Sequence, residues 1–508
     1  MNRKDLANKI WHACDIMRRD DGTTGVLEYM EQLSWMIFLK VFEDLEKRFE
    51  DEYKFEGRNY EAIIEPKFRW SAWATASDKE LEKYFSIEEL AEIRAAKEHV
   101  LIAFINRKLF PYLRSLRGSP EKERIATIFQ EINGNRMKSP FNLRDVITVL
   151  NEIDFNNAQD SHVLSQVYEE LLLRLGKEGG VAGEFYTPRP IVRLMVRIIE
   201  PKIGEKVFDP FCGSGGFLVE SYRLMIKSRE ITIEDYELLQ YKSFYGQEKK
   251  PLPYLFGVMN CILHGLLHPN IVRKNTLEEN IRNVPEAERF EVILTNPPFG
   301  GKEGKHIEQN FPYPSSKTEI LALQYVMRKL KKGGRCGIVV PEGILFNTSE
   351  KAFVNTKKDL IENYNIHTII SLPSGVFANV TSSGQGPKTN LLFFTRGEPT
   401  KEIWYFDFAG YSEVVLDKRY TKANPVTDED LSVVYEAWKK REIGEWSWIV
   451  KVEEIINNNY DMTARNPNRK EEVRYPEPIK IVESILEKEK EINALLEEIK
   501  KVVGGEKY

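Results

Sequence analysis

One short segment of this chain follows an apolar stretch and consists of an asparagine, two prolines and an aromatic residue. The stretch is Val292-Ile293-Leu294, and the segment that could do chemistry is Asn296, Pro297, Pro298 and Phe299. An exocyclic amine on a purine is a poor nucleophile because its lone pair is delocalised. The Asn296 side-chain oxygen and the Pro297 carbonyl are both acceptors, and two amine hydrogens held by them would localise that lone pair. The segment predicts methyl transfer to an amino group, although Asn-Pro-Pro also occurs in ordinary turns.

The two prolines and the aromatic ring complete this expectation. Proline fixes φ and has no backbone N–H, so the chain turns sharply with a carbonyl free to face a substrate. Phe299 would cover one face of a base. Stacking of that kind is worth about 1–3 kcal/mol, which helps offset the few kcal/mol needed to extract a base from a duplex.

A glycine loop lies upstream, between a predicted strand and a predicted helix. Lys206-Val207-Phe208 reads as the strand, and Gly216 to Tyr222 reads as the helix. The loop between them is Asp209-Pro210-Phe211-Cys212-Gly213-Ser214-Gly215-Gly216. Glycines allow a ligand to approach the backbone closely, so the loop could hold a cofactor, a dinucleotide, or only a turn.

Glu248 is the candidate ribose-binding acid, and it lies too far downstream for the dinucleotide fingerprint. That fingerprint places its acid about 20 residues on, and an insertion around 227–242 would account for the extra length. We expect Glu248 to end the second strand and to accept hydrogen bonds from ribose hydroxyls. The alternative is an ordinary surface acid.

Three segments together resemble a known enzyme family. The resemblance is to the amino-methyltransferases that modify adenine N6 in DNA. It is carried by Gly183 to Val192, by the Asp-Pro-Phe-Cys-Gly-Ser-Gly-Gly loop and by Asn-Pro-Pro-Phe. More narrowly, the chain resembles the methylation subunit of type I restriction-modification systems. Residues 25–44 are similar to the helical N-terminal domain of that family, and residues 459–467 to its C-terminal signature, so the resemblance covers most of the chain.

The resemblance implies S-adenosylmethionine as the methyl donor and a set of residues that contact it. Asp209 would support the loop and Glu248 would bind the ribose. Asn275 stands where related enzymes often carry an Asp or Asn near the adenine ring of the cofactor, so it is a further candidate contact. The other implied cofactor residues are Glu184, Phe185, Tyr186, Thr187, Pro188, Arg189, Gly213, Ser214, Gly215 and Gly216. Asn296, Pro297, Pro298 and Phe299 would be catalytic, acting on an adenine flipped out of the duplex. Phe299 stands where many related enzymes have Tyr.

The periodicity divides the chain into four regions. Residues 1–175 show helical spacing, and residues 176–400 alternate apolar strands with helices, which is typical of a doubly wound α/β sheet like that of S-adenosylmethionine-dependent methyltransferases. Residues 401–475 are mixed, and residues 476–508 form a charged helix with an apolar stripe. That last helix either packs on the chain itself or, as the resemblance suggests, docks onto a specificity subunit.

Two polar loops flank the predicted sheet, at 300–316 and 374–388. Loops of this length are often functional. We expect them to become ordered around DNA or the flipped base, unless they are plain surface loops.

Composition limits the other classes. The 508 residues include four scattered cysteines, so neither a disulfide framework nor a metal site is expected. Cytosine C5 methylation would need a cysteine nucleophile, but Cys212 lies inside the predicted cofactor loop. With no apolar run of about 18 residues and no signal-peptide core, we expect a cytoplasmic protein that does not enter a membrane.

The net charge of −5 and a pI near 6 argue against a chain that grips DNA alone. The family implies double-stranded DNA as substrate, a specificity subunit that reads the sequence, a second copy of this chain and a restriction subunit for cleavage. Alternatives are methylation of a protein glutamine or of an RNA base amine, or a catalytically idle scaffold of the restriction complex.

Overall fold

The structure is a computed structural model that describes most of the chain. The described residues are 3–23, 25–55, 57, 59–153, 186–377, 387–421 and 424–468, with scattered positions between 486 and 496. The chain divides into two units, residues 1–466 and residues 467–508, and each is considered by itself. In the second unit only a few helical positions are described, so the predicted docking helix at 476–508 lies largely outside the described residues and stays a prediction.

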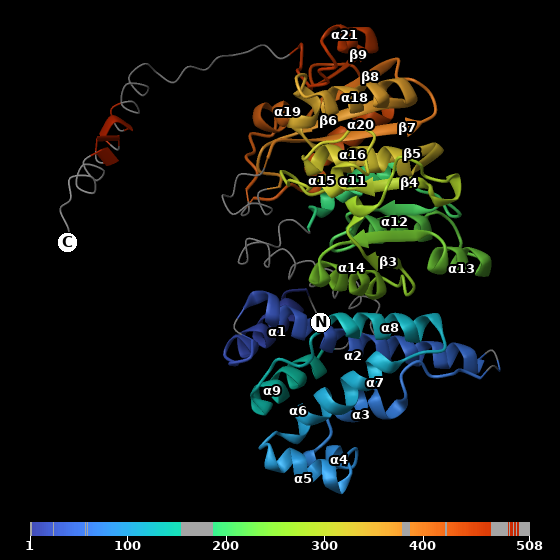
Figure 1. Cartoon of the computed structure of the whole chain (residues 1–508), viewed down its shortest axis with the longest axis vertical. Helices are drawn as coiled ribbons and strands as arrows, with labels where there is room; N and C mark the ends of the chain where they lie inside the picture. The colour runs from blue at the N-terminus through green and yellow to red at the C-terminus, as the bar shows by residue number, and fades with distance from the viewer. Residues whose placement is uncertain are drawn as a thin grey trace. The chain divides into compact units, whose positions relative to one another are not determined.

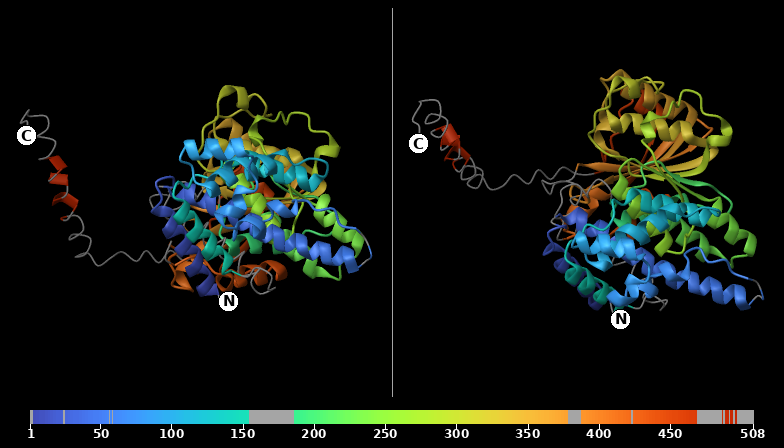
Figure 2. Two further views of the ribbon diagram at one scale, coloured as in Figure 1. Left: turned by 90° about the horizontal axis from the view of Figure 1, so that it is seen from below. Right: turned by 60° about the horizontal axis from the view of Figure 1, so that its bottom comes forward.

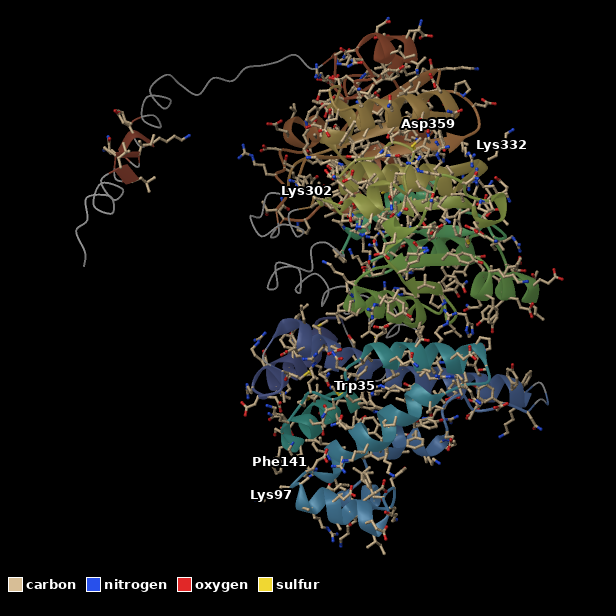
Figure 3. The ribbon with its side chains drawn as sticks, viewed as in Figure 1. Trp35, Lys97, Phe141, Lys302, Lys332 and Asp359 are labelled. Carbon is tan, nitrogen blue, oxygen red and sulfur yellow. The ribbon has the colours of Figure 1, made fainter. Side chains whose placement is uncertain are left out.

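The first part of the larger unit is helical, as the spacing of its apolar residues predicts. Leu33 and Ile37 are buried along its longest helix, and Trp35 packs edge-on against Phe110 at a centroid distance of 5.3 Å (Figure 3). Within the described ranges, every helix is too short or too polar to cross a lipid bilayer. The helices of this part are α1 (Arg3–Arg18), α2 (Val26–Phe55), η1 (Pro66–Phe68), α3 (Trp70–Trp73), α4 (Asp78–Glu82), α5 (Ile87–Ala95), α6 (Val100–Phe104), η2 (Ile105–Leu109), α7 (Phe110–Ser115), α8 (Pro120–Glu131) and α9 (Pro140–Asn151).

Serine followed by proline starts two of these helices. The Lys122 N–H donates to Ser119 Oγ at 3.3 Å at the start of α8. Ser139 caps α9 in the same way, with Pro140 at the first helical position. The serine side chain satisfies a free N–H, and proline needs no hydrogen bond there.

The rest of the larger unit is a nine-stranded sheet. Its order is β3-β2-β1-β4-β5-β7-β6-β8-β9, and β1 to β5 run parallel, whereas β7 is antiparallel to both β5 and β6. Figure 1 shows the strands stacked with helices on both faces. The strands are β1 (Val207–Asp209), β2 (Phe244–Glu248), β3 (Asn270–Arg273), β4 (Phe290–Thr295), β5 (Leu330–Pro341), β6 (Tyr364–Leu372), β7 (Thr389–Arg396), β8 (Glu402–Asp407) and β9 (Ser447–Lys451).

The helices of this part fall into two groups that share different hydrophobic cores. The first group, α11, α12, α14 and α20, packs with one face of the sheet and shares its core with the helical part, while α16, α17 and α18 pack on the other face. Their bounds, with the remaining helices, are α11 (Arg189–Ile199), α12 (Gly216–Ser228), α13 (Ile233–Tyr241), α14 (Pro251–Leu263), η4 (Thr276–Glu278), η5 (Glu286–Glu288), α15 (Lys305–Glu308), α16 (Thr318–Lys329), α17 (Glu342–Phe346), α18 (Lys351–Asn363), α19 (Phe408–Val414), α20 (Asp428–Lys440) and α21 (Val452–Asn457).

The doubly wound α/β prediction is confirmed, with one difference in extent. β8 and β9 continue the sheet to Lys451, past the limit near residue 400 that the sequence suggested. β8 pairs parallel with β6, and β9 is an antiparallel edge strand. The insertion expected at 227–242 is the extra helix α13 between α12 and β2.

The loop at 300–316 has secondary structure of its own, and its expected role around DNA or the flipped base stays a prediction. It contains α15, and Lys302 forms an isolated antiparallel bridge with Lys317. Thr318 donates its N–H to the Gly301 carbonyl at 3.1 Å and its hydroxyl to Glu303 Oε1 at 2.9 Å. Of the second loop, residues 378–386 lie outside the described residues.

Candidate active site

The two motifs meet because they follow neighbouring parallel strands. Val207 of β1 is in register with Val292 of β4, so both strands reach their carboxyl ends together. There the Thr295 hydroxyl donates to Asp209 Oδ1 at 2.6 Å, and the Phe211 N–H donates to the same oxygen at 3.2 Å. Ligands bind at this edge in open α/β sheets.

Burial makes Asp209 an unusual acid. Its side chain is about 1% exposed, and this desolvation raises the pKa of Asp209 to about 7 although the Thr295 and Phe211 hydrogen bonds oppose it. Glu248 adds to the rise as a like charge. A cation in this position would favour the ionised carboxylate.

The glycine loop has the backbone that its sequence predicts. Gly213 and Gly215 have positive φ angles of 47° and 71°, a region that other residues seldom adopt. Gly216 begins α12, and a Cβ at Gly216 would overlap the guanidinium of Arg189. The loop is therefore closed in on the side of α11.

Glu248 ends β2 as expected, and its carboxylate supports the loop. Its Oε2 accepts from the Gly213 N–H at 3.1 Å, and its Oε1 accepts from the Lys250 N–H at 2.8 Å. Burial raises the pKa of Glu248, opposed by these backbone donors. Each carboxylate oxygen has a second lone pair that a hydroxyl could use.

Asn296 is held in one orientation by a residue far away in the sequence. Its Nδ2 donates to Thr187 Oγ1 at 3.0 Å. Its Oδ1 is buried and has no hydrogen-bond partner among the described residues. A buried acceptor without a partner costs about 1–3 kcal/mol, a cost that a hydrogen-bond donor from water or a ligand would relieve.

The predicted Tyr186 to Arg189 segment joins the loop and Asn296 around one pocket. Tyr186, Pro188 and Arg189 are buried, and Arg189 lies 5.8 Å from the centre of the Tyr186 ring. Glu184 and Phe185 lie outside the described residues, so their predicted contact stays a prediction. The pocket is lined by Thr187, Arg189, Asp209, Phe211, Cys212, Ser214, Gly216, Phe217 and Asn296.

Phe299 faces a second aromatic ring that the sequence did not identify. Phe299 is half-buried, and its centroid is 6.2 Å from that of Phe377 with the rings at 89°. Pro297 is buried and Pro298 is exposed. Phe377 follows β6 within the polar 374–388 loop, where an isolated aromatic was the available signal.

Asn275 is one of several predicted residues that do not line this pocket; Tyr186, Gly213, Gly215 and Glu248 are others. Asn275 is the N-cap residue of η4, and its Nδ2 donates to Glu278 Oε1 at 3.0 Å. Its neighbour Lys274 donates its N–H to the Glu248 carbonyl at 2.9 Å. Asn275 is therefore close to Glu248 along the backbone but is absent from the pocket lining.

Figure 3 labels two lysines of the sheet part. Lys302, just beyond the carboxyl end of β4, and Lys332, near the start of β5, lie on opposite sides of the sheet part.

A thiol mechanism is not favoured here. Cys212 is buried, and desolvation raises the pKa of its thiol well above the usual value. The thiolate is the reactive form. Among the described residues no group of three or more His, Cys, Asp or Glu is placed to hold a metal ion.

The chain matches two family models that together span most of it. Residues 159–475 match the N-6 DNA methylase model, and residues 6–169 match the HsdM N-terminal domain model. The chain is 36% identical to the methylase subunit of the type I restriction enzyme EcoEI from Escherichia coli, covering 97% of this chain and 96% of that protein.

Solved structures agree with these matches. A chain from a study of complex assembly and conformational transition of the type I restriction-modification system is 46% identical, with a TM-score of 0.75 and all of both chains covered. A modification subunit assigned to a type I restriction enzyme of Vibrio vulnificus YJ016 is 37% identical, with a TM-score of 0.80, covering 93% of this chain and 99% of that one. The chain therefore belongs to the N-6 DNA methylases and, within them, to the methylase subunits of type I restriction-modification systems.

Proposed function

We propose that this methylase subunit transfers the methyl group of S-adenosylmethionine to N6 of adenine in DNA. The observation that carries the proposal is Asn296, whose Oδ1 is a buried acceptor without a partner among the described residues while its Nδ2 is held by Thr187. An adenine amine can fill that vacancy as a donor. The N6 amine is the exocyclic group that the family of DNA methylases modifies.

The protein polarises the amine and needs no covalent intermediate. Asn296 Oδ1 and the Pro297 carbonyl would accept the two N6 hydrogens and localise the nitrogen lone pair. Phe299 would stack on the base, and the ring of Phe377 stands at 89° to that of Phe299. As the nitrogen–carbon bond forms, the sulfur–carbon bond breaks, S-adenosylhomocysteine leaves and the surplus proton passes to water.

The pocket residues fit the cofactor. When bound, S-adenosylmethionine supplies a methyl group on a positively charged sulfur. Arg189 is placed to pair with a carboxylate, Asp209 with a cation, and Glu248 can accept ribose hydroxyls while it holds the Gly213 N–H. A side chain at position 216 would displace the guanidinium of Arg189.

Partners follow from the family. The relatives are named as subunits of restriction enzymes, and we propose that this chain works with a specificity subunit, a second copy of itself and, for cleavage, a restriction subunit on double-stranded DNA. The chain carries a net charge of −5, which supports a shared grip on the DNA phosphates. The relatives are DNA methylases, which disfavours the protein-glutamine and RNA alternatives.

The test is transfer of labelled methyl from S-adenosylmethionine to duplex DNA, with the chain alone and with the specificity subunit encoded beside it. Label in N6-methyladenine after hydrolysis of the DNA, seen only with the partner, is the expected result. Label in cytosine, or none in the complete complex, would overturn the proposal. Equal activity of the chain alone would overturn the partner requirement.

A further inference from the structure

Helix α14 supports the cofactor loop from behind. Asn260 on α14 is fully buried, and its Nδ2 donates to the Ser214 carbonyl at 2.7 Å. Gly257, one turn earlier, lies so close that a Cβ there would be 2.7 Å from the Gly213 carbonyl. The position of α14 therefore fixes the peptide units around Gly213 and Gly215.

The same helix packs against the helical part of the chain. α14 contacts both α2 and α8, and Figures 1 and 2 show α8 beside the segment that contains α14. Ile125 and Phe129 of α8 belong to one continuous hydrophobic core with Leu255 and Met259 of α14. Interiors of this kind are close-packed and transmit displacement, so a shift of α8 would move α14.

Polar contacts form a second link, which leads to Glu248. Glu131 at the end of α8 makes an ion pair with Arg273 at the end of β3. Arg273 is in register with Glu248 on β2, and the next residue, Lys274, donates its N–H to the Glu248 carbonyl at 2.9 Å. The end of α8 is thus linked to the predicted ribose-binding residue by an ion pair, one peptide bond and a hydrogen bond.

We propose that the helical N-terminal part sets the affinity of the cofactor pocket by fixing α14 and β3. The inference rests on the proposed use of S-adenosylmethionine and adds a positioning role for α8, which contributes no residue to the pocket lining. Coupling between two sites is reciprocal, so an occupied pocket also holds α8 more firmly. Any event that moves α8, such as docking of DNA or a subunit, changes the occupancy of the pocket.

A charge-reversal cycle across the Glu131–Arg273 pair tests the polar link. The variants are Glu131→Arg, Arg273→Glu and the double reversal, and the readout is the Kd for S-adenosylhomocysteine by calorimetry on the full-length chain. Each single variant should bind about threefold or more weakly, and the double variant should recover most of the loss. Single variants with unchanged affinity would overturn the link. A double variant that binds as weakly as Arg273→Glu would also overturn it, because Arg273 would then act without Glu131.

The matched control reverses a pair that stays within the helical part. Lys122, also on α8, pairs with Glu61 at 2.6 Å, and its reversal should leave the Kd unchanged. A loss equal to that of the interface pair would mean that any damage to α8 weakens binding, and would overturn the specific route. If the wild-type chain binds no S-adenosylhomocysteine, the proposed function fails instead.

Asn260→Leu tests the loop end of α14, with Gln324→Leu as its control. Gln324 Nε2 also donates from a buried position to a backbone carbonyl, that of Tyr313 at 2.8 Å, but on α16 at the other face of the sheet. The Asn260 variant should weaken S-adenosylhomocysteine binding about tenfold and the Gln324 variant should not, at matched thermal stability. Equal affinities of the two variants would contradict the role of α14.

Hydrogen exchange gives the reciprocal readout, because S-adenosylhomocysteine should slow amide exchange in α8 of the wild-type chain. An unchanged exchange rate would count against coupling.

Discussion

At the scale of single residues, the site depends on groups kept in states that water would not favour. Asp209 is a carboxyl with little access to solvent, and Asn296 keeps an acceptor without a partner among the described residues. Both states cost stability in the free chain. Under the proposed function, each would be relieved by a ligand of the right kind, a cation for Asp209 and an amine for Asn296.

The pKa of Asp209 predicts how cofactor binding depends on pH. Its folded-state pKa of about 7 lies above the ordinary value of 3.8, so the native chain holds a proton that the unfolded chain has released. The contribution of Asp209 to the free energy of unfolding should therefore fall as pH rises from about 4 to about 7 and level off above it. A bound cation favours the ionised form, so affinity for S-adenosylmethionine should be greatest above about pH 7 and fall below it.

Calorimetry from about pH 5.5 to about pH 8.5 checks this expectation. Binding of S-adenosylmethionine should release a proton at the lower end of the pH range. In the Asp209→Asn variant, binding should release no such proton. A wild-type affinity that stays constant across the range would contradict the role given to Asp209.

The sequence indicated the candidate site residues but not the side chains that hold them. Asn296, Asp209 and Glu248 are recognisable because each ends a strand or follows one directly. Thr187 is 109 residues from its partner Asn296, and Asn260 is 46 residues from Ser214. Such pairings are set by the packing of α11 and α14, which no local pattern reports. The aromatic stretch of β8 was a strand signal that the sequence analysis left in a mixed region.

At the scale of elements, the junction of β1 and α12 is expected to be sensitive to the size of the residue at position 216. Gly216→Ala would push a methyl group into the guanidinium of Arg189, and overpacking of this kind costs about 1–3 kcal/mol. We expect cofactor affinity to fall about tenfold or more in this variant.

Gly444→Ala is the matched control for that substitution. Nothing lies within 4 Å of a Cβ at Gly444, and the residue precedes β9, so affinity should be unchanged. Equilibrium binding of S-adenosylhomocysteine compares the two variants. Equal affinities would mean that the close approach at Gly216 does not shape the pocket.

At the scale of the whole molecule, catalysis and partner recognition are expected to reside in different units. Residues 1–466 form one compact unit that contains the pocket, and residues 467–508 form the other. A chain ended after Asn466 should keep its thermal unfolding midpoint and its cofactor affinity. It should lose methylation of DNA that depends on the specificity subunit, because the predicted docking helix at 476–508 is gone.

Gel filtration of the shortened chain with the specificity subunit, followed by methyl transfer, checks this division. A shortened chain that still forms the complex and methylates DNA would show that docking uses the larger unit. A shortened chain that unfolds would show that the two units depend on each other.

The central claim is that Asn296 activates the target amine, and the most direct measurement compares three chains in the complete complex. Wild type, Asn296→Asp and Asn296→Ala should bind S-adenosylhomocysteine with similar affinity. Transfer to N6 of adenine should fall in that order, with Asn296→Ala slower by about 10²-fold or more because an acceptor aimed at the reacting atom is lost. An Asn296→Ala chain that methylates adenine at the wild-type rate would contradict the account.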